Sequence, residues 1–243
     1  MNPDDPAAAF PPIHAALTEP DGLLAAGGDL SSERLLYAYR MGIFPWYQAG
    51  QPILWWSPDP RCILRPAEFH IARRLRRSMQ KCSWRLTFNR KFSEVIHACA
   101  GPRRSGQGTW ITNDMAEAFE SLHRAGWAHS VEIHDGKQLV GGMYGLAIGR
   151  VFFGESMFSH EENASKYALL GLCSVIRQHA FELIDCQVES GHLLTLGAVT
   201  VPRARFRETL DSACEPPMPF EKWPAGPISV ASLRATYGLR SLQ

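Results

Sequence analysis

The most informative polar residues lie in the run LIDCQV, residues 183–188, whose apolar character is typical of a strand. Because side chains alternate along a strand, Asp185 and Gln187 share one face. A carboxylate and an amide are costly to bury there unless each is hydrogen-bonded. A structural polar pair that closes a turn explains the spacing equally well. As functional groups, an amide accepts a hydrogen bond from an amine, and a neighbouring carboxylate orients that amide. The pair therefore suits a reaction with an amine nucleophile.

Glu155, in the run FFGESMFS, is expected where a strand gives way to a glycine turn. Its carboxylate can hold an ammonium or guanidinium group, or it can cap the turn through backbone N–H groups. The nearby GGMYG lacks the spacing of a phosphate-binding loop, and the absence of a GxSxG run disfavours a serine hydrolase. Six cysteines and nine histidines show no CxxC or HxxxH spacing, so we expect buried reduced thiols, no metal site and no cofactor.

Positive charge is concentrated in one segment of a chain whose net charge is only +1. Residues 61–91 carry a charge of +9, which leaves −8 on the rest. Helical spacing over 70–81 places Arg73, Arg76 and Arg77 on one face. The opposite face is apolar and should turn toward the protein: Ile71, Leu75 and Met79. A solvated basic helix is one interpretation, and a surface that follows a phosphate backbone is the other.

Tryptophans favour the second interpretation of the basic helix. Trp46 and Trp110 lie in loop-like runs, where an exposed aromatic ring can stack on a base. Trp55 and Trp56 point to opposite sides of an extended chain, so we expect one of them in the core. Two loop tryptophans beside a basic helix predict nucleic-acid binding.

The elements that must position these residues are of mixed type. Helices are expected over 31–42, 70–81, 90–100, 113–124, 164–179, 190–196 and 202–210, and strands over 129–135, 138–148, 150–158 and 183–188. We expect Asn113 or Asp114 to cap the fourth helix, Asn163 to cap the fifth, and Asp135-Gly136 to form a hairpin turn. The loop PRRSGQG suggests a boundary between a domain of 1–100 and a domain of 101–243. The fold class is α+β.

A string of motifs resembles the leucyl/phenylalanyl-tRNA–protein transferase family. In order, they are EPDGLLAAGGDLS, GIFPWY, PILWWSPDPR, GTWIT, LVGGMYG, FGESMFS, ENASK and LIDCQV, spread over about 20–210. The resemblance implies a small N-terminal domain followed by a GNAT-like acyltransferase domain. It also implies transfer of Leu, Phe or Met from aminoacyl-tRNA to proteins that begin with Arg or Lys, which creates an N-degron.

The same resemblance implies roles for individual residues. Asp185, Gln187 and Glu155 match the catalytic residues. The 3′-terminal adenosine would be held by Tyr39, Trp46 and Trp110. The walls of the aminoacyl side-chain pocket would be Met143, Phe152, Leu172 and Ile176. The acceptor stem would be gripped by Arg73, Arg77 and Lys81.

Two other classes of function stay open on sequence alone. One is a GNAT-like acyltransferase with another donor, although the helix start HEENASK lacks the glycines that a pyrophosphate loop requires. The other is a non-catalytic tRNA-binding module. No run approaches the length of a membrane span, and the start MNPDDPAAAF has no basic region before an apolar run. We therefore expect a cytoplasmic protein that contacts no membrane, and the family resemblance implies a monomer.

Overall fold

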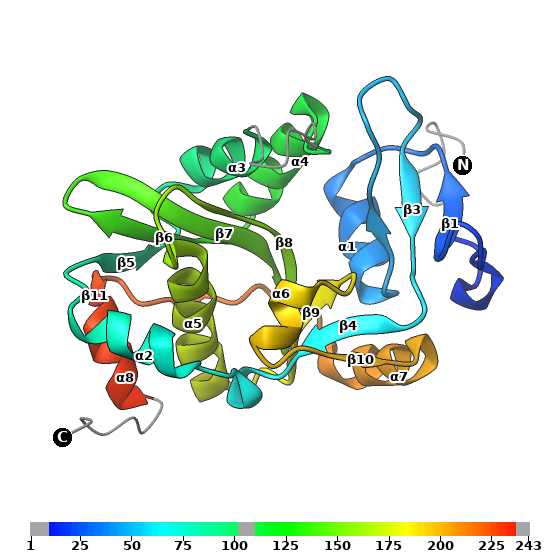
Figure 1. Cartoon of the computed structure of the whole chain (residues 1–243). Coiled ribbons are helices and arrows are strands. Elements are labelled where there is room, and N and C mark those ends of the chain that lie inside the picture. Colours follow the sequence, from blue (N-terminus) through cyan, green and yellow to red (C-terminus); the bar gives the residue numbers. More distant parts are fainter. Residues whose placement is uncertain (1–9, 102–109, 237–243) are drawn as a thin grey trace.

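Two β-sheets organise the chain, shown in Figure 1 as a computed structural model that describes residues 10–101 and 110–236. The small sheet has the order β1-β3-β2, with bounds Leu23–Ala26, Leu54–Trp56 and Phe44–Pro45, and its neighbours are antiparallel. Helix α1 (Ser32–Arg40) connects β1 to β2. Trp55 is buried in the core and Trp56 is half-buried, as the alternation predicts.

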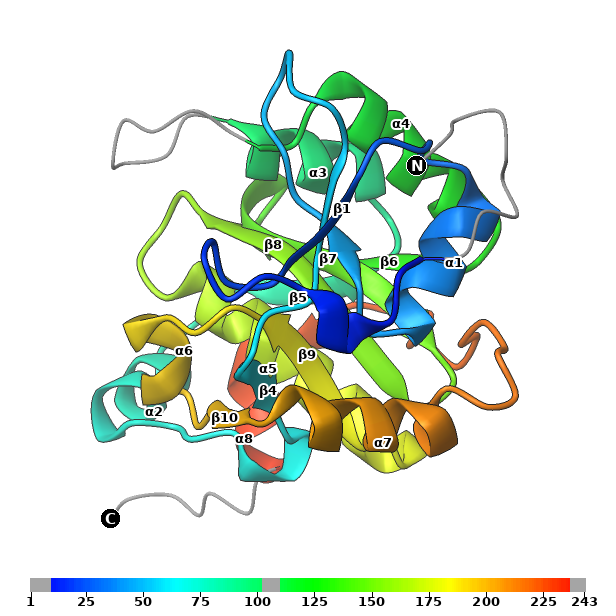
Figure 2. The same cartoon turned by 90° about the vertical axis from the view of Figure 1, so that its right-hand side faces the viewer.

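The large sheet has eight strands in the order β10-β4-β9-β8-β7-β6-β5-β11. Their bounds, in that order, are Val199–Val201, Arg61–Leu64, Leu183–Gln187, Val151–Ser159, Gln138–Ile148, Ala128–Asp135, Arg85–Phe88 and Ile228–Ser229. All neighbours are antiparallel except β8 and β9, which are parallel. The molecule is thus a mixed α+β fold with a small N-terminal unit, which in Figure 2 faces the viewer in front of the large sheet.

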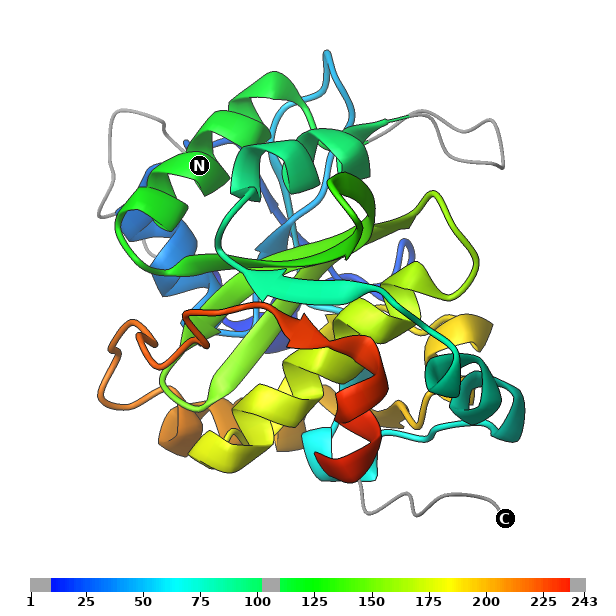
Figure 3. The same cartoon turned by 90° about the vertical axis from the view of Figure 1, so that its left-hand side faces the viewer.

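Helices cover both faces of the large sheet (Figure 3). On one face lie α3 (Phe92–Ala100) and α4 (Asn113–Arg124), which contact β6, β7 and β8. On the other lies α5 (Ala164–Ile176), with α2 (Arg73–Gln80) and α8 (Leu233–Thr236) packed in the same apolar core. The remaining helices are α6 (Gly191–Thr195) and α7 (Arg203–Ala213), and short 3₁₀ turns span Ile13–Ala15, Pro66–Glu68, Arg177–His179 and Val230–Ser232. Within the described residues, no helix is long and apolar enough to cross a membrane.

Three local expectations need correction. Helix α4 is capped by Thr112, whose side chain accepts a hydrogen bond from the Met115 N–H, one position before Asn113. Asn163 does occupy the position before α5, but it is left-handed (φ 69°) and its side chain makes no capping bond; it accepts from Lys166 instead. The β6–β7 hairpin turns at residues 136–137, because Asp135 still pairs with Gln138.

The expected division at residue 100 cuts across the large sheet. Strands β4 and β5 precede residue 100, yet both are hydrogen-bonded into that sheet, whereas the small sheet ends at Trp56. We propose instead that the boundary lies near residue 60. The run 102–108, which suggested the boundary, lies outside the described residues.

Candidate active site

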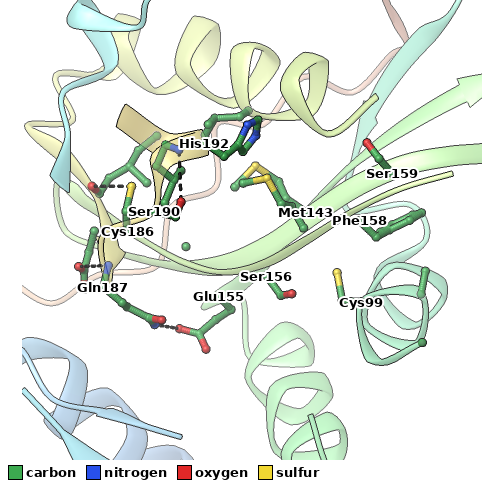
Figure 4. Close-up of a pocket in the computed structure, with 18 of the residues that line it drawn as sticks. Cys99, Met143, Glu155, Ser156, Phe158, Ser159, Cys186, Gln187, Ser190 and His192 are labelled. Atoms are coloured by element: carbon green, nitrogen blue, oxygen red, sulfur yellow. Dashed lines mark hydrogen bonds between the residues drawn. The ribbon is translucent and has the colours of Figure 1, made fainter. Parts of the chain in front are cut away.

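A cavity opens where the two parallel strands diverge. Strands β8 and β9 pair only from Val151↔Leu183 to Phe153↔Asp185, after which β8 continues to Ser159. Residues of both strands beyond this point line a cavity of about 450 Å³, which α3, α5 and α6 complete (Figure 4). Apolar side chains predominate in its wall: Met143, Met157, Phe158, Leu169, Ile184 and Leu193. Such a cavity accommodates an apolar side chain of amino-acid size.

Glu155 is the polar centre of this cavity. Its Oε1 accepts hydrogen bonds from the Tyr39 hydroxyl and from Gln187 Nε2, both at 2.7 Å. Its Oε2 is buried and has no hydrogen-bond partner among the described residues. Burial raises the pKa of Glu155 to about 8, an effect that the hydrogen bond from Tyr39 partly opposes. The carboxyl therefore titrates near neutrality, as a group that exchanges protons in catalysis should.

The sequence led us to expect that Asp185 orients the side chain of Gln187. In the structure it does not. Its Oδ1 accepts a hydrogen bond from the backbone N–H of Gln187 at 2.9 Å, and the amide of Gln187 reaches Glu155 instead. Asp185 is fully buried and forms a two-pronged ion pair with Arg61, Nε–Oδ1 2.8 Å and Nη2–Oδ2 2.7 Å. Arg61 therefore belongs to the site and not to the basic surface.

Gln187 departs from regular strand geometry. Its φ of 63° lies in the left-handed region, which is uncommon for a residue with a side chain. The simple alternation expected over 183–188 thus ends at Gln187, whose Nε2 turns toward Glu155 (Figure 4). An amide that donates through Nε2 keeps Oε1 as an acceptor that points away from that donor's partner. This is the polarity needed to receive an amine.

Sequence similarity relates the chain to a known family. The model of the leucyl/phenylalanyl-tRNA protein transferase family matches residues 63–211, and the model of that family's N-terminal domain matches residues 28–59. A Stutzerimonas stutzeri protein named leucyl/phenylalanyl-tRNA–protein transferase is 56% identical over 202 residues, which cover 83% of this chain and 89% of the relative. A Xanthomonas campestris protein of the same name is 52% identical over 220 residues, 90% and 88% of the two chains.

The chain belongs to the leucyl/phenylalanyl-tRNA–protein transferase family. It is therefore a transferase, and the resemblance seen in its motifs is confirmed. The two family models divide between residues 59 and 63, close to the end of the small sheet.

Of the four pocket walls that the family resemblance implied, only Met143 lines the cavity. Phe152, Leu172 and Ile176 are fully buried in the core on the α5 side of the sheet. The walls that sequence reasoning missed include Leu169 and Ile184. Leu169 lies on the apolar stripe of α5 and Ile184 alternates with Asp185, but neither pattern distinguishes a cavity wall from core.

The three aromatic residues assigned to the adenosine occupy different environments. The Tyr39 ring is completely buried, packs edge-on against Phe153 and donates to Glu155, so no ring face is open for stacking. Trp46 is 45% exposed with its ring 5.7 Å from that of Trp56. Trp110 is half-buried against the core; neither tryptophan is among the residues that line the cavity.

Helix α2 presents the expected basic surface. Arg73, Arg77 and the following Lys81 are exposed, while Leu75 and Met79 are buried. Arg76, which the helical spacing placed on the same face as Arg73 and Arg77, is half-buried instead. The exposed Arg74 lies 3.5 Å from Glu162, in the turn that follows β8. This contact places the helix beside the loop that leads from the cavity.

Proposed function

We propose that this chain transfers Leu, Phe or Met from aminoacyl-tRNA to the N-terminal α-amine of proteins that begin with Arg or Lys. The observation that carries the proposal is the Glu155–Gln187 pair, joined by a 2.7 Å hydrogen bond and set in the wall of a cavity with a largely apolar lining. The cavity suits the donor side chain, and the pair suits the acceptor amine. The curated relatives' name supplies the donor class.

The proposed chemistry needs no ATP, because an aminoacyl ester is already activated. An α-amine has a pKa of about 7.7–8.0, so a usable fraction is neutral at pH 7. Gln187 Oε1 accepts a hydrogen bond from this amine and aims its lone pair at the ester carbonyl. The new C–N bond forms as the ester C–O bond breaks.

Glu155 is the group that we assign to the proton. Its pKa of about 8 nearly matches that of the amine, so a proton passes between them at little cost. When Glu155 is ionised, its unpartnered Oε2 receives this proton. The proton then passes to the ribose oxygen that leaves, which balances the reaction. Gln187 orients, since an amide has no protonation step near neutral pH.

The nucleic-acid substrate is assigned to the exposed cations and one exposed ring. Arg73, Arg77 and Lys81 of α2 would neutralise phosphates of the acceptor stem. Trp46 is the more exposed candidate for the terminal adenosine, with Trp110 as the second. The diverging parallel strands favour a GNAT-like architecture for the large domain. One chain supplies all these parts, consistent with a monomer that acts on aminoacyl-tRNA and cellular proteins in the cytoplasm, where its product would serve as an N-degron.

The deciding experiment is transfer of radiolabelled Leu or Phe from charged tRNA to a model protein with N-terminal Arg, without ATP. We expect labelling that disappears when the N-terminal Arg is replaced by Ala. Asp185→Ala should leave tRNA affinity near wild type while transfer falls by orders of magnitude. Binding without transfer would indicate a tRNA-binding module. Transfer from acyl-CoA alone would indicate another GNAT-like acyltransferase.

A further inference from the structure

All three nitrogen atoms of the Arg61 guanidinium group donate hydrogen bonds in the interior of the protein. Besides the two contacts with Asp185, its Nη1 donates to the carbonyl of Gly42 at 3.1 Å, and only 1% of its side chain is exposed. The Gly42 carbonyl is presented from a left-handed residue, φ 78°, close against Phe206. Arg61 thus connects β4, the turn after α1 and the catalytic strand β9.

Two aromatic rings make cation–π contacts with the guanidinium group of Arg61. The Cζ atom lies 4.8 Å from the ring centroid of Phe44, in β2, and 4.8 Å from that of Phe206, in α7. The two cation–π contacts hold the group in place, and the forked carboxylate fixes its rotation. A lysine ammonium offers neither a plane nor a fork, so it cannot reproduce this arrangement.

The fixed carboxylate in turn holds Gln187. Asp185 Oδ1 accepts from both Arg61 Nε and the Gln187 backbone N–H. The left-handed conformation of Gln187 is costly for a residue with a side chain and persists only where its surroundings enforce it. In that conformation its Nε2 donates to Glu155. A continuous series of contacts therefore runs from Arg61 to the cavity, although the Arg61 side chain itself is not among the groups that line it.

We propose that Arg61 is a positioning residue for aminoacyl transfer: it fixes Asp185, which holds Gln187 in the conformation that aims its amide at Glu155 and the acceptor amine. This assignment rests on the proposed function for its kinetic consequences. Its structural consequence, the fixed backbone of Gln187, can be measured without any substrate.

The test compares three variants of the full chain. Arg61→Lys keeps the charge and loses the fork. Arg61→Met combined with Asp185→Asn removes both buried charges, so neither is left uncompensated. Arg34→Met is the matched control, because Arg34 is also 1% exposed and pairs with a carboxylate, that of Asp29, which does not line the cavity. The measurements are Tm, kcat and KM for aminoacyl-tRNA, and amide hydrogen exchange over residues 186–190.

We expect Arg61→Lys to lower kcat about 100-fold, as misplacement of a reacting group by about 1 Å does, with KM changed less than about twofold. The neutral double variant should have a higher Tm than Arg61→Lys, but its kcat should stay low. Amide exchange over 186–190 should be faster than wild type in both Arg61→Lys and the double variant. Arg34→Met should lose Tm while kcat and exchange there stay near wild type. Wild-type kcat in Arg61→Lys, or recovery of kcat together with Tm in the double variant, would overturn the proposal.

Failure of the proposed function gives a different result. If the wild type transfers nothing, the function is wrong, and exchange alone decides on Arg61. Faster exchange over 186–190 in Arg61→Lys then supports its hold on Gln187, and unchanged exchange refutes it.

Discussion

Glu155 shows how burial can convert an ordinary carboxyl into a group that titrates near neutrality. It is buried in the cavity wall, where the charged form is poorly solvated, and the electrostatic repulsion from Asp185 acts in the same direction. Hydrogen bonds from Tyr39 and Gln187, both to the same oxygen, and the charge of Arg61 offset these effects in part. The carboxyl is therefore mostly protonated at pH 7 and ionises at a slightly higher pH.

This raised pKa predicts a pH-dependent stability. Between 4.5, its ordinary value, and about 8, the folded state retains a proton that the unfolded state has released. The free energy of unfolding should therefore fall as pH rises through this window, by at most about 1.4 kcal/mol per pH unit from this group. Urea denaturation of Glu155→Gln, which cannot titrate, should show a flatter pH dependence than wild type. Parallel curves for the two proteins would refute the raised pKa.

At the scale of elements, the divergence of β8 and β9 creates the cavity, and helix α2 supplies the charge beside it. The two features have different origins. The divergence follows from strand pairing that ends at Phe153 and Asp185. The basic face of α2 follows from local periodicity, with Leu75 and Met79 anchoring the helix in the core. Shape therefore comes from long-range pairing and charge from the local sequence.

Helix α2 predicts a salt-dependent contribution to tRNA binding. Each phosphate contact that is lost should lower the slope of log K against log salt by about 0.7–0.9. Arg73→Ala and Arg77→Ala should each weaken binding and flatten that slope, measured by filter binding at several salt concentrations. The exposed Arg124, in α4 on the other side of the sheet, is the control, and Arg124→Ala should leave the slope unchanged. An unchanged slope in the α2 variants would place the phosphate contacts elsewhere.

At the scale of the whole molecule, both edge strands of the large sheet come from segments late in the chain. Strand β10 pairs with β4, and β11 pairs with β5. Val230 and Leu233, next to β11, are buried in the same core as α5. The family model ends at residue 211, before β11. The sequence pattern predicted no helix or strand in that later part of the chain.

We expect β11 and α8 to stabilise the fold and to take no part in catalysis. Leu233→Ala should lower the free energy of unfolding by about 2–5 kcal/mol, because it leaves a cavity in the core. The kcat of the folded fraction should stay near wild type, since Leu233 does not line the cavity beside Glu155. Met218→Ala, at a side chain that is 60% exposed, is the control and should change stability little. Urea denaturation and transfer assays decide, and a selective loss of kcat would contradict this role.

Within the described residues, the sequence by itself indicated helices α1 to α7, strands β6 to β9 and the residue types of the site, but not α8 or the other strands. Periodicity and capping are local, so α1, α2, α3 and the β6–β7–β8 run follow from neighbouring residues. Motif order in turn identified the family. The polar residues Glu155, Asp185 and Gln187 stood out because they interrupt apolar strands.

Only the tertiary structure decided which of these residues meet. Tyr39 and Glu155 are 116 positions apart, and Arg61 and Asp185 are 124 apart, so no local pattern connects them. Arg61 looked like one more cation of a basic segment until the pairing of β4 with β9 brought it against Asp185. The cavity walls likewise depend on where two strands stop pairing. Strand order and register are set by the packing of the whole chain, and they turn residues of suitable chemistry into a site.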